Sequence, residues 1–271
     1  MDRRPTDLPG VESTPGYVPA STSVTIPQEG ERLMATTTNK QRLFTQLLAL
    51  ADYPAGESVE TLPVLEQFIY GLCRENATRE QADSAFENLK DRFFDWNEIR
   101  VSTNRELEEA MEGLSDTETR AQRLISFLQE VFETEFSFDL EGMHKKGLKV
   151  AAKALVRYGA SNDYIGAWVV QRSLGGHAIP VDTPTLRCAK RLGIIDADAE
   201  EIEAVRATLE HLVPKTKNQA FTDAISDVAE QFCWEDEPNC SSCSLRADCP
   251  TGQENVAGAV EAGRATRAKP R

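Results

Sequence analysis

The chain has 271 residues and carries 30 Lys and Arg residues against 44 Asp and Glu residues, a formal net charge of −14. That balance argues against a general polyanion binder, and the length suffices for one large or two small domains with apolar cores. No apolar run approaches the ~18 residues that a membrane-spanning helix needs, so the sequence excludes a membrane protein.

The two ends of the chain differ from its middle. Residues 1–36 are rich in Pro, Ser, Thr and Gly without apolar periodicity, which predicts a disordered leader, and Met34 is a second candidate start. The leader lacks the apolar stretch of a secretory signal, so we expect a cytoplasmic protein. Residues 252–271 are polar, and we expect a disordered tail there.

Apolar residues of the middle recur at the spacing of an amphipathic helix, three and four positions apart. The pattern occurs at 65–72, 121–128 and 221–228, and no sustained apolar–polar alternation indicates a strand. Capping-box patterns at 78–81 and 115–118 predict two helix starts, and Pro184 predicts a third. The sequence therefore predicts an all-α fold of roughly ten helices joined by short loops.

Basic side chains are concentrated between residues 141 and 192. This stretch has nine basic and three acidic residues, a net charge of +6 on an otherwise acidic chain. Such a segment is compatible with contact to phosphate groups, and it is equally compatible with a solvated helix face. Its basic residues are Lys145, Lys146, Lys149, Lys153, Arg157, Arg172, Arg187, Lys190 and Arg191.

Four of the six cysteines form one run with the spacing C-x6-C-x2-C-x5-C. Four thiolates so close together suit a soft metal centre, either Zn²⁺ or an iron–sulfur cluster, better than a disulfide framework. Structural zinc sites generally use two C-x2-4-C pairs, and this run has one such pair. Cys73 and Cys188 lie far from the run and are expected to be small buried apolar residues. The run consists of Cys233, Cys240, Cys243 and Cys249.

A second pattern precedes the cysteine run, at residues 158–192. It contains Gly175 and, six residues later, the tripeptide V-D-T at 181–183. Together with the cysteine spacing, this stretch resembles the helix–hairpin–helix and catalytic loop of the endonuclease III superfamily of DNA glycosylases, whose C-terminal loop holds a [4Fe–4S] cluster. Segments 76–78 and 120–121 resemble two further parts of the same family pattern.

The resemblance implies two helical lobes and a role in base-excision repair. One lobe, a six-helix domain containing the hairpin, would comprise residues 57–177. The other would comprise residues 37–56 and 178–251 and hold the [4Fe–4S] cluster on the four run cysteines. Such a protein would be a monomer that removes a damaged or mismatched base from double-stranded DNA. Asp182, at the edge of a groove between the lobes, would stabilise the sugar cation or orient the attacking water.

The resemblance also implies which side chains contact DNA. The hairpin corresponds to residues 158–162, so Ala160, Ser161 and Asn162 are candidates for phosphate contact, and Asn162 is the candidate for a left-handed turn residue. The three tryptophans, at positions 96, 168 and 234, are expected in the core. Five basic residues are further candidates for DNA contact: Lys145, Lys146, Arg187, Lys190 and Arg191.

Three positions depart from the family pattern. Tyr164 occupies the place of the lysine that forms a Schiff base and drives strand cleavage, so the resemblance implies a monofunctional glycosylase with Tyr164 in the catalytic site. Ala160 replaces a hairpin glycine. An acidic segment at 235–237 replaces a basic one, and its carboxylates would repel phosphates. The hairpin and the acidic segment favour an alternative, a non-catalytic relative retained for DNA binding, redox sensing or partner recognition. A zinc-stapled helical adaptor is a third alternative.

Overall fold

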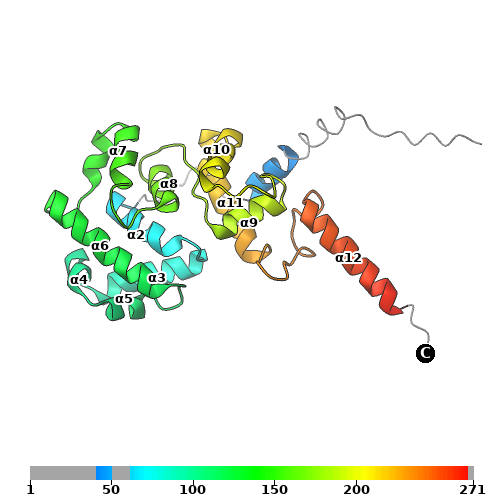
Figure 1. Ribbon diagram of the computed structural model, residues 1–271, viewed down its shortest axis with the longest axis horizontal. Helices are drawn as coiled ribbons and strands as arrows, with labels where there is room; N and C mark the ends of the chain where they lie inside the picture. Colours follow the sequence, from blue (N-terminus) through cyan, green and yellow to red (C-terminus); the bar gives the residue numbers. More distant parts are fainter. Residues whose placement is uncertain (1–40, 51–61, 268–271) are drawn as a thin grey trace, which may run out of the picture.

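The computed structural model describes residues 41–50 and 62–267. In these ranges the regular elements are all α or 3-10 helices and no strand is present, which confirms the all-α prediction (Figure 1). Residues 41–50 form a helix, and the predicted leader lies outside the described residues. The other elements are α2 (Val64–Arg74), α3 (Arg79–Arg92), α4 (Trp96–Val101), α5 (Asn104–Ala110), α6 (Thr117–Glu135), η1 (Glu141–Lys145), α7 (Leu148–Leu155), α8 (Asp163–Arg172), α9 (Thr183–Arg191), α10 (Ile202–Leu212), η2 (Lys215–Lys217), α11 (Asn218–Gln231) and α12 (Pro250–Arg267).

Buried apolar residues form two separate cores, which define two lobes. The core of the first lobe, residues 62–178, is built around α2, which packs against α3, α6 and α8. Apolar side chains surround α2 on most sides, as expected for a central helix, and its Phe68 ring stacks on Phe127 of α6 with 3.8 Å between ring centroids. This lobe is therefore held by packing between neighbouring helices.

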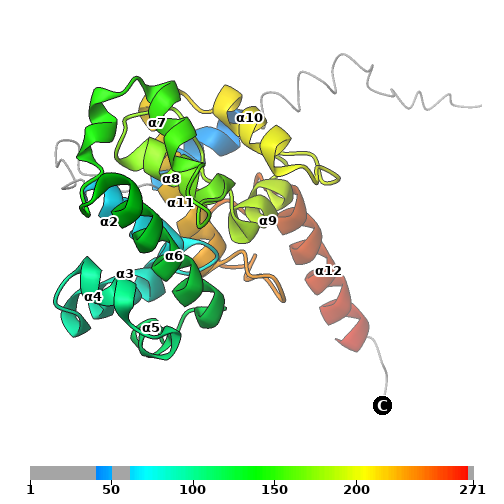
Figure 2. The same cartoon turned by 60° about the vertical axis from the view of Figure 1, so that its left-hand side comes forward.

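The second lobe combines the helix at 41–50 with residues 179–249. Leu43 and Leu47 from that first helix join α9, α10 and α11 in one core, so segments far apart in the sequence lie side by side (Figures 1 and 2). The passage from one lobe to the other follows α8. There Gly175 has a left-handed φ of +61°, and a Cβ on Gly176 would lie 2.4 Å from the side chain of Val170. Both glycines are required by the turn and the close packing.

Polar side chains buried between the lobes fix how they meet. Arg172 of α8 forms an ion pair with Asp223 of α11, and Nε2 of Gln171 donates to Oγ1 of Thr222 over 3.0 Å. Arg74, at the end of α2, forms an ion pair with Glu230 of α11. Removing one partner of such a buried pair typically costs ~3–5 kcal/mol. The relative position of the lobes is thus set by charge pairing as well as by apolar contact.

Two of the three predicted helix starts are confirmed. The capping box of Thr78 and Gln81 is present at α3, and Pro184 lies in the first turn of α9. The prediction at 115–118 is wrong, because α6 begins at Thr117 after Asp116, which has a left-handed φ of 52° and does not cap with its side chain. A capping box that the prediction missed starts α5, between residues 103 and 106.

The predicted disordered tail is also wrong over most of its length, because α12 continues to Arg267. Pro250 suits the first turn of a helix, and four alanines within 250–267 favour helix over coil. In both views α12 extends away from the lobes (Figures 1 and 2). None of the described helices is both long and apolar enough to cross a membrane.

Candidate functional site between the lobes and in the cysteine loop

A cleft lies where the two lobes meet, and it encloses about 660 Å³ of empty space, part of it open to solvent. One wall comes from the turn between α2 and α3, and the other from the start of α9, the end of α11 and the segment that follows. We call it the interlobe cleft. Its lining residues are Arg74, Asn76, Ala77, Thr78, Gln81, Asp182, Pro184, Arg187, Ser226, Ala229, Glu230, Trp234 and Glu235.

Asp182 lines this cleft and is held by backbone hydrogen bonds from both lobes. It is the N-cap of α9, and its Oδ1 accepts a hydrogen bond from the Thr185 amide over 3.0 Å. Its Oδ2 accepts a hydrogen bond from the Asn76 amide over 3.2 Å. The side chain is only 8% exposed. The carboxylate is therefore a cap and, at the same time, a charged group of fixed orientation on the cleft wall.

Asn76 was singled out in the sequence only as part of a resemblance, and the structure shows what it does. Its φ of 54° is left-handed, a conformation that asparagine adopts more readily than most residues. Its Oδ1 accepts a hydrogen bond from the Thr183 amide over 3.0 Å, while its own amide donates to Asp182. This reciprocal pair joins the turn after α2 to the first residues of α9.

Tyr164, the second predicted catalytic residue, does not line the cleft. It lies on α8 with 6% of its surface exposed, and its ring stacks on Trp168 with 6.0 Å between centroids. Burial raises the pKa of the Tyr164 phenol well above its usual value, and the negative charge of Asp182 raises it further. Tyr164 is thus a neutral core residue near Asp182, and it is separated from the space where a substrate would bind.

The hairpin at 158–162 has no residue with positive φ, so the prediction of a left-handed Asn162 is wrong. Asn162 has an extended backbone with φ −140° because it caps α8, and its Oδ1 accepts from the Ile165 amide over 2.9 Å. Ala160 is 2% exposed, and its carbonyl accepts a hydrogen bond from Arg123 over 2.9 Å. The Ser161 hydroxyl is buried, and its amide donates to the carbonyl of Tyr158 over 2.9 Å.

Carboxylates from neighbouring helices occupy the outer face of this hairpin. The Gly159 amide donates to Glu130 of α6, with 3.0 Å to Oε2 and 3.2 Å to Oε1. A Cβ at position 159 would lie 3.0 Å from the Glu130 carboxylate, so glycine permits this close approach. The side-chain amide of Asn162 donates to Glu75 over 2.6 Å. Two hairpin donors, the Gly159 amide and the Asn162 side-chain amide, are therefore engaged by protein carboxylates.

The predicted basic contacts fall into two groups. Lys145 and Lys146 are exposed beside η1 on the first lobe, and Lys190 is half-buried in the last turn of α9. Arg187 and Arg191 instead hold the segment after α11. Nε of Arg187 donates to the carbonyl of Cys233 over 2.9 Å, and Nη2 of Arg191 donates to that of Glu235 over 2.8 Å.

Trp234 also lines the cleft, so the prediction of a core residue is wrong there. It is 44% exposed, and its Nε1 donates to the carbonyl of Glu230 over 2.7 Å. Trp168 is buried as expected, and Trp96 packs half-buried against the first core. The acidic segment 235–237 that follows Trp234 is exposed. An aromatic face and several carboxylates therefore share the mouth of the cleft.

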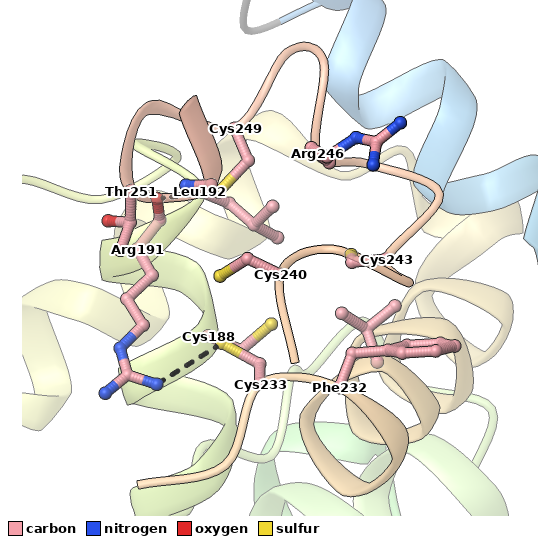
Figure 3. A pocket seen from close by; sticks show the side chains of 12 residues that line it. Cys188, Arg191, Leu192, Phe232, Cys233, Cys240, Cys243, Arg246, Cys249 and Thr251 are labelled. Atoms are coloured by element: carbon pink, nitrogen blue, oxygen red, sulfur yellow. Dashed lines mark hydrogen bonds between the residues drawn. The ribbon is translucent and has the colours of Figure 1, made fainter. Parts of the chain in front are cut away.

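A second cavity, with about 350 Å³ of empty space, lies between α9, the end of α11 and the loop at 233–249 (Figure 3). All four run cysteines line it, and we call it the cysteine cavity. Nitrogen donors reach the sulfurs: the Gly252 amide to Cys249 over 3.3 Å and the Asn255 amide nitrogen to Cys240 over 3.4 Å. Arg191 donates to the sulfur of Cys233 over 3.7 Å.

Cys188 lines the same cavity, which the sequence did not indicate. It lies on α9 beside Cys233 (Figure 3). Cys73, in contrast, is in the core of the first lobe. The neighbouring Cys188 thiol lowers the pKa of Cys233 to about 6, against the effect of burial, and Arg191 lowers it further. The Cys233 sulfur and burial raise the pKa of Cys188.

The residues that could hold a metal in the cysteine cavity are its cysteines. Within 41–50 and 62–267, no three His, Cys, Asp or Glu side chains are placed to hold one metal ion. The four cysteines surround a cavity, and no carboxylate is among the residues that line it. A zinc ion needs all four sulfurs ~2.3 Å from one centre, whereas in a [4Fe–4S] cluster each thiolate binds a different iron.

The architecture matches solved structures of DNA glycosylases. A trapped covalent complex of endonuclease III with DNA is 19% identical, covers 80% of this chain and 98% of its own, and gives a TM-score of 0.62. A non-covalent endonuclease III–DNA complex gives 0.63 at the same identity and coverage. The chain has the endonuclease III fold. A thermostable thymine-DNA glycosylase is similar, at 16% identity over 81% of this chain and 99% of its own, with a TM-score of 0.60.

Similarity at the sequence level is weaker than similarity of fold. DEMETER-like protein 3 of Arabidopsis thaliana is 22% identical in an alignment 171 residues long that covers 57% of this chain. The match spans 16% of the length of that relative. No family model matches the chain.

Proposed function

We propose that the protein is a DNA N-glycosylase of base-excision repair that hydrolyses the bond between a damaged or mismatched base and its sugar. The observation that carries the proposal is Asp182, a carboxylate oriented by amides of both lobes on the wall of the interlobe cleft, in a chain with the endonuclease III fold. A carboxylate fixed beside a cavity can act on charge that develops in a substrate bound there.

Asp182 would act on the sugar. As the C1′–N bond breaks, its electrons leave with the base and positive charge develops at C1′. The carboxylate stabilises that charge or orients a water molecule, whose oxygen bonds to C1′ while its proton is transferred to the departing base or to solvent. Trp234, exposed at the same cleft, offers an aromatic face on which an extruded base could stack.

The composition of the cleft supports hydrolysis without strand cleavage. Strand cleavage by β-elimination needs an amine that forms a Schiff base with C1′. No lysine is among the described residues that line the cleft, and Tyr164 is a buried phenol. We expect that borohydride traps no covalent complex between the protein and DNA containing an abasic site. A strong trapped adduct would mean that a lysine outside the cleft lining, such as Lys149 or Lys153, reaches the sugar.

The cysteine cavity would hold a [4Fe–4S] cluster on Cys233, Cys240, Cys243 and Cys249. A cluster of this kind can act as a structural cross-link between segments. Here it would join the end of α11 to a loop in which only Leu245 and Cys249 belong to the buried apolar core. Nitrogen donors to the sulfurs would stabilise the thiolates. Absorption near 400 nm with iron and acid-labile sulfide in the purified protein is the expected signature.

The test of the function is a screen of damaged and mismatched duplexes. Duplexes are incubated with the iron-loaded protein, and hot alkali then cleaves the strand wherever a base has been removed. We expect cleavage of at least one duplex, with alkali required to reveal it. Binding to duplexes in the absence of any base release across the panel would contradict the proposal.

A second candidate is a non-catalytic relative of the same fold that binds DNA or a partner. It is favoured by the hairpin, where Glu130 occupies the Gly159 amide, and by the exposed acidic segment at 235–237. Both would oppose a DNA backbone at these places. Selective binding to damaged duplexes without base release would support this candidate.

A further inference from the structure

Cys188 has the position of a ligand although it lies outside the cysteine run. It is fully buried on α9 and lines the cysteine cavity together with the four cysteines of the run. The buried cysteine of the first lobe, Cys73, packs among apolar side chains of α2 and its neighbours. Two cysteines that the sequence does not distinguish therefore have different surroundings, and only one of them faces other thiols.

The partner of Cys188 is Cys233, and both are held by helices. Cys188 belongs to the middle of α9, and Cys233 directly follows α11, where its amide donates to the carbonyl of Val228 over 2.9 Å. Arg187 fixes the Cys233 carbonyl from α9. Both thiols line the cysteine cavity and lie beside one another there (Figure 3). The cysteines at 240, 243 and 249 lie on the loop, so Cys188 is paired with the one run cysteine that the packed helices position.

We propose that Cys188 is a fifth metal-ligating thiol, which can replace Cys233 on the same iron of the cluster. The inference rests on the proposed [4Fe–4S] cluster. The exchange needs no oxidant or reductant: as the bond from iron to the Cys233 sulfur breaks, the Cys188 thiol gives its proton to that sulfur, and the Cys188 thiolate takes the vacated metal bond. One S–H bond and one S–metal bond break, and one of each forms.

This arrangement makes one ligand position of the cavity replaceable and leaves the others irreplaceable. Cys240 and Cys243 lie on the loop at 233–249, whereas Cys188 lies beside Cys233 (Figure 3), so we expect Cys188 to replace Cys233 and neither of these two loop cysteines. A cluster with such a reserve would survive oxidation or alkylation of Cys233, which is more exposed than the buried Cys188.

The experiment compares iron and acid-labile sulfide per chain, and absorption near 400 nm, in variants of the full-length protein purified without oxygen. Cys233→Ala should keep roughly half or more of the wild-type iron, because Cys188 takes its place. Cys233→Ala/Cys188→Ala should keep less than about a tenth. Cys240→Ala alone should lose as much as that double variant. Cys233→Ala/Cys73→Ala is the matched control, and it should retain the iron of Cys233→Ala.

The outcomes separate the inference from the proposed cluster. If Cys233→Ala loses as much iron as Cys240→Ala, the inference is overturned while the cluster stands. If the wild-type protein contains no iron, both are overturned together. Should the double alanine variant fail to fold, as judged by helical circular dichroism, Cys188→Ser in the Cys233→Ala background conserves the side-chain volume. Retention of iron by that variant equal to Cys233→Ala would also overturn the inference.

Discussion

The interlobe cleft and the cysteine cavity hold their polar groups in different ways. In the cleft, Asp182 is oriented by backbone amides of residues 76 and 185, which belong to two packed lobes. In the cavity, the cysteines lie on a loop of which only Leu245 and Cys249 join the buried apolar core. The first arrangement is produced by folding itself, and the second depends on what the thiols bind.

The two sites should therefore fail independently. If the proposed cluster is lost, the loop should unfold and α9 and α11 should become less stable. The first lobe should retain its core. Loss of the Asp182 charge should stop the chemistry in a molecule that remains folded and still binds metal. Each of the following substitutions acts on one side of this comparison.

The largest effect is expected from loss of a cluster ligand. Cys243→Ser should lower the free energy of unfolding of the second lobe by about 5 kcal/mol, because the ligated loop has little apolar contact to replace the metal bonds. Hydrogen exchange should show protection lost in α9, α11 and the loop and retained in α2 and α6. Cys73→Ala is a control outside the cavity. Equal loss of protection in both lobes would contradict the separation of the two sites.

The next largest effect concerns the charge of Asp182. Asp182→Asn should reduce base release by a factor of about 10²–10³, since a well-placed charged group contributes ~3–4 kcal/mol to a barrier. An asparagine side chain has one acceptor oxygen where aspartate has two, so one of the two backbone amides that bond Asp182 loses its acceptor. This loss costs about 1 kcal/mol of stability. Single-turnover rates measure the loss of catalysis, and thermal unfolding measures the loss of stability. Wild-type excision by Asp182→Asn would end the case for this residue.

The sequence predicts those features that neighbouring residues encode. Helical spacing at 65–72 and 221–228 predicts helices because one helix face must be buried, and the spacing of the cysteine run places four thiols on one loop. The start of α9 is local in the same way, since Pro184 predicts it and the Asp182 cap involves residues three positions apart. These local patterns predict the all-α class of the fold and several of its helices.

What the sequence could not predict depends on how the two lobes pack. The Asn76 amide donates a hydrogen bond to Asp182, which lies 106 positions further along the chain. Cys188 lies beside Cys233 because α9 packs against α11. Trp234 was expected in the core on its residue type, yet it directly follows the first run cysteine at the cleft mouth. The polar composition of 252–271 suggested disorder, although its alanines favour helix. In each case the deciding contact or propensity is absent from the motifs.

A smaller effect is expected from the residue that links Asp182 to the first lobe. Asn76→Gly keeps the amide that donates to Asp182 and suits a φ of 54°, but removes the acceptor of the Thr183 amide. Asn76→Ala adds strain to the left-handed backbone, which costs of order 1–2 kcal/mol. We expect base release to fall roughly tenfold for Ala and by about threefold for Gly.

The readout for Asn76 is the maximal single-turnover rate compared with the affinity for the duplex. A positioning role lowers the rate and leaves the affinity nearly unchanged. If both variants lose only thermal stability and excise at the wild-type rate, Asn76 is a structural link between the lobes and does not orient the carboxylate.

The smallest effect is expected at the hairpin, where Glu130 accepts from the Gly159 amide. Glu130→Gln removes a negative charge from the place where a DNA phosphate would approach, so duplex affinity should rise by about two- to fivefold at low salt. The gain should disappear as salt increases, because screening weakens the repulsion that the carboxylate causes. Glu133→Gln, one turn further along α6, is the matched control because it removes the same charge away from the hairpin. An equal gain from both variants would show that net charge alone matters, and that Glu130 does not compete with phosphate at the Gly159 amide.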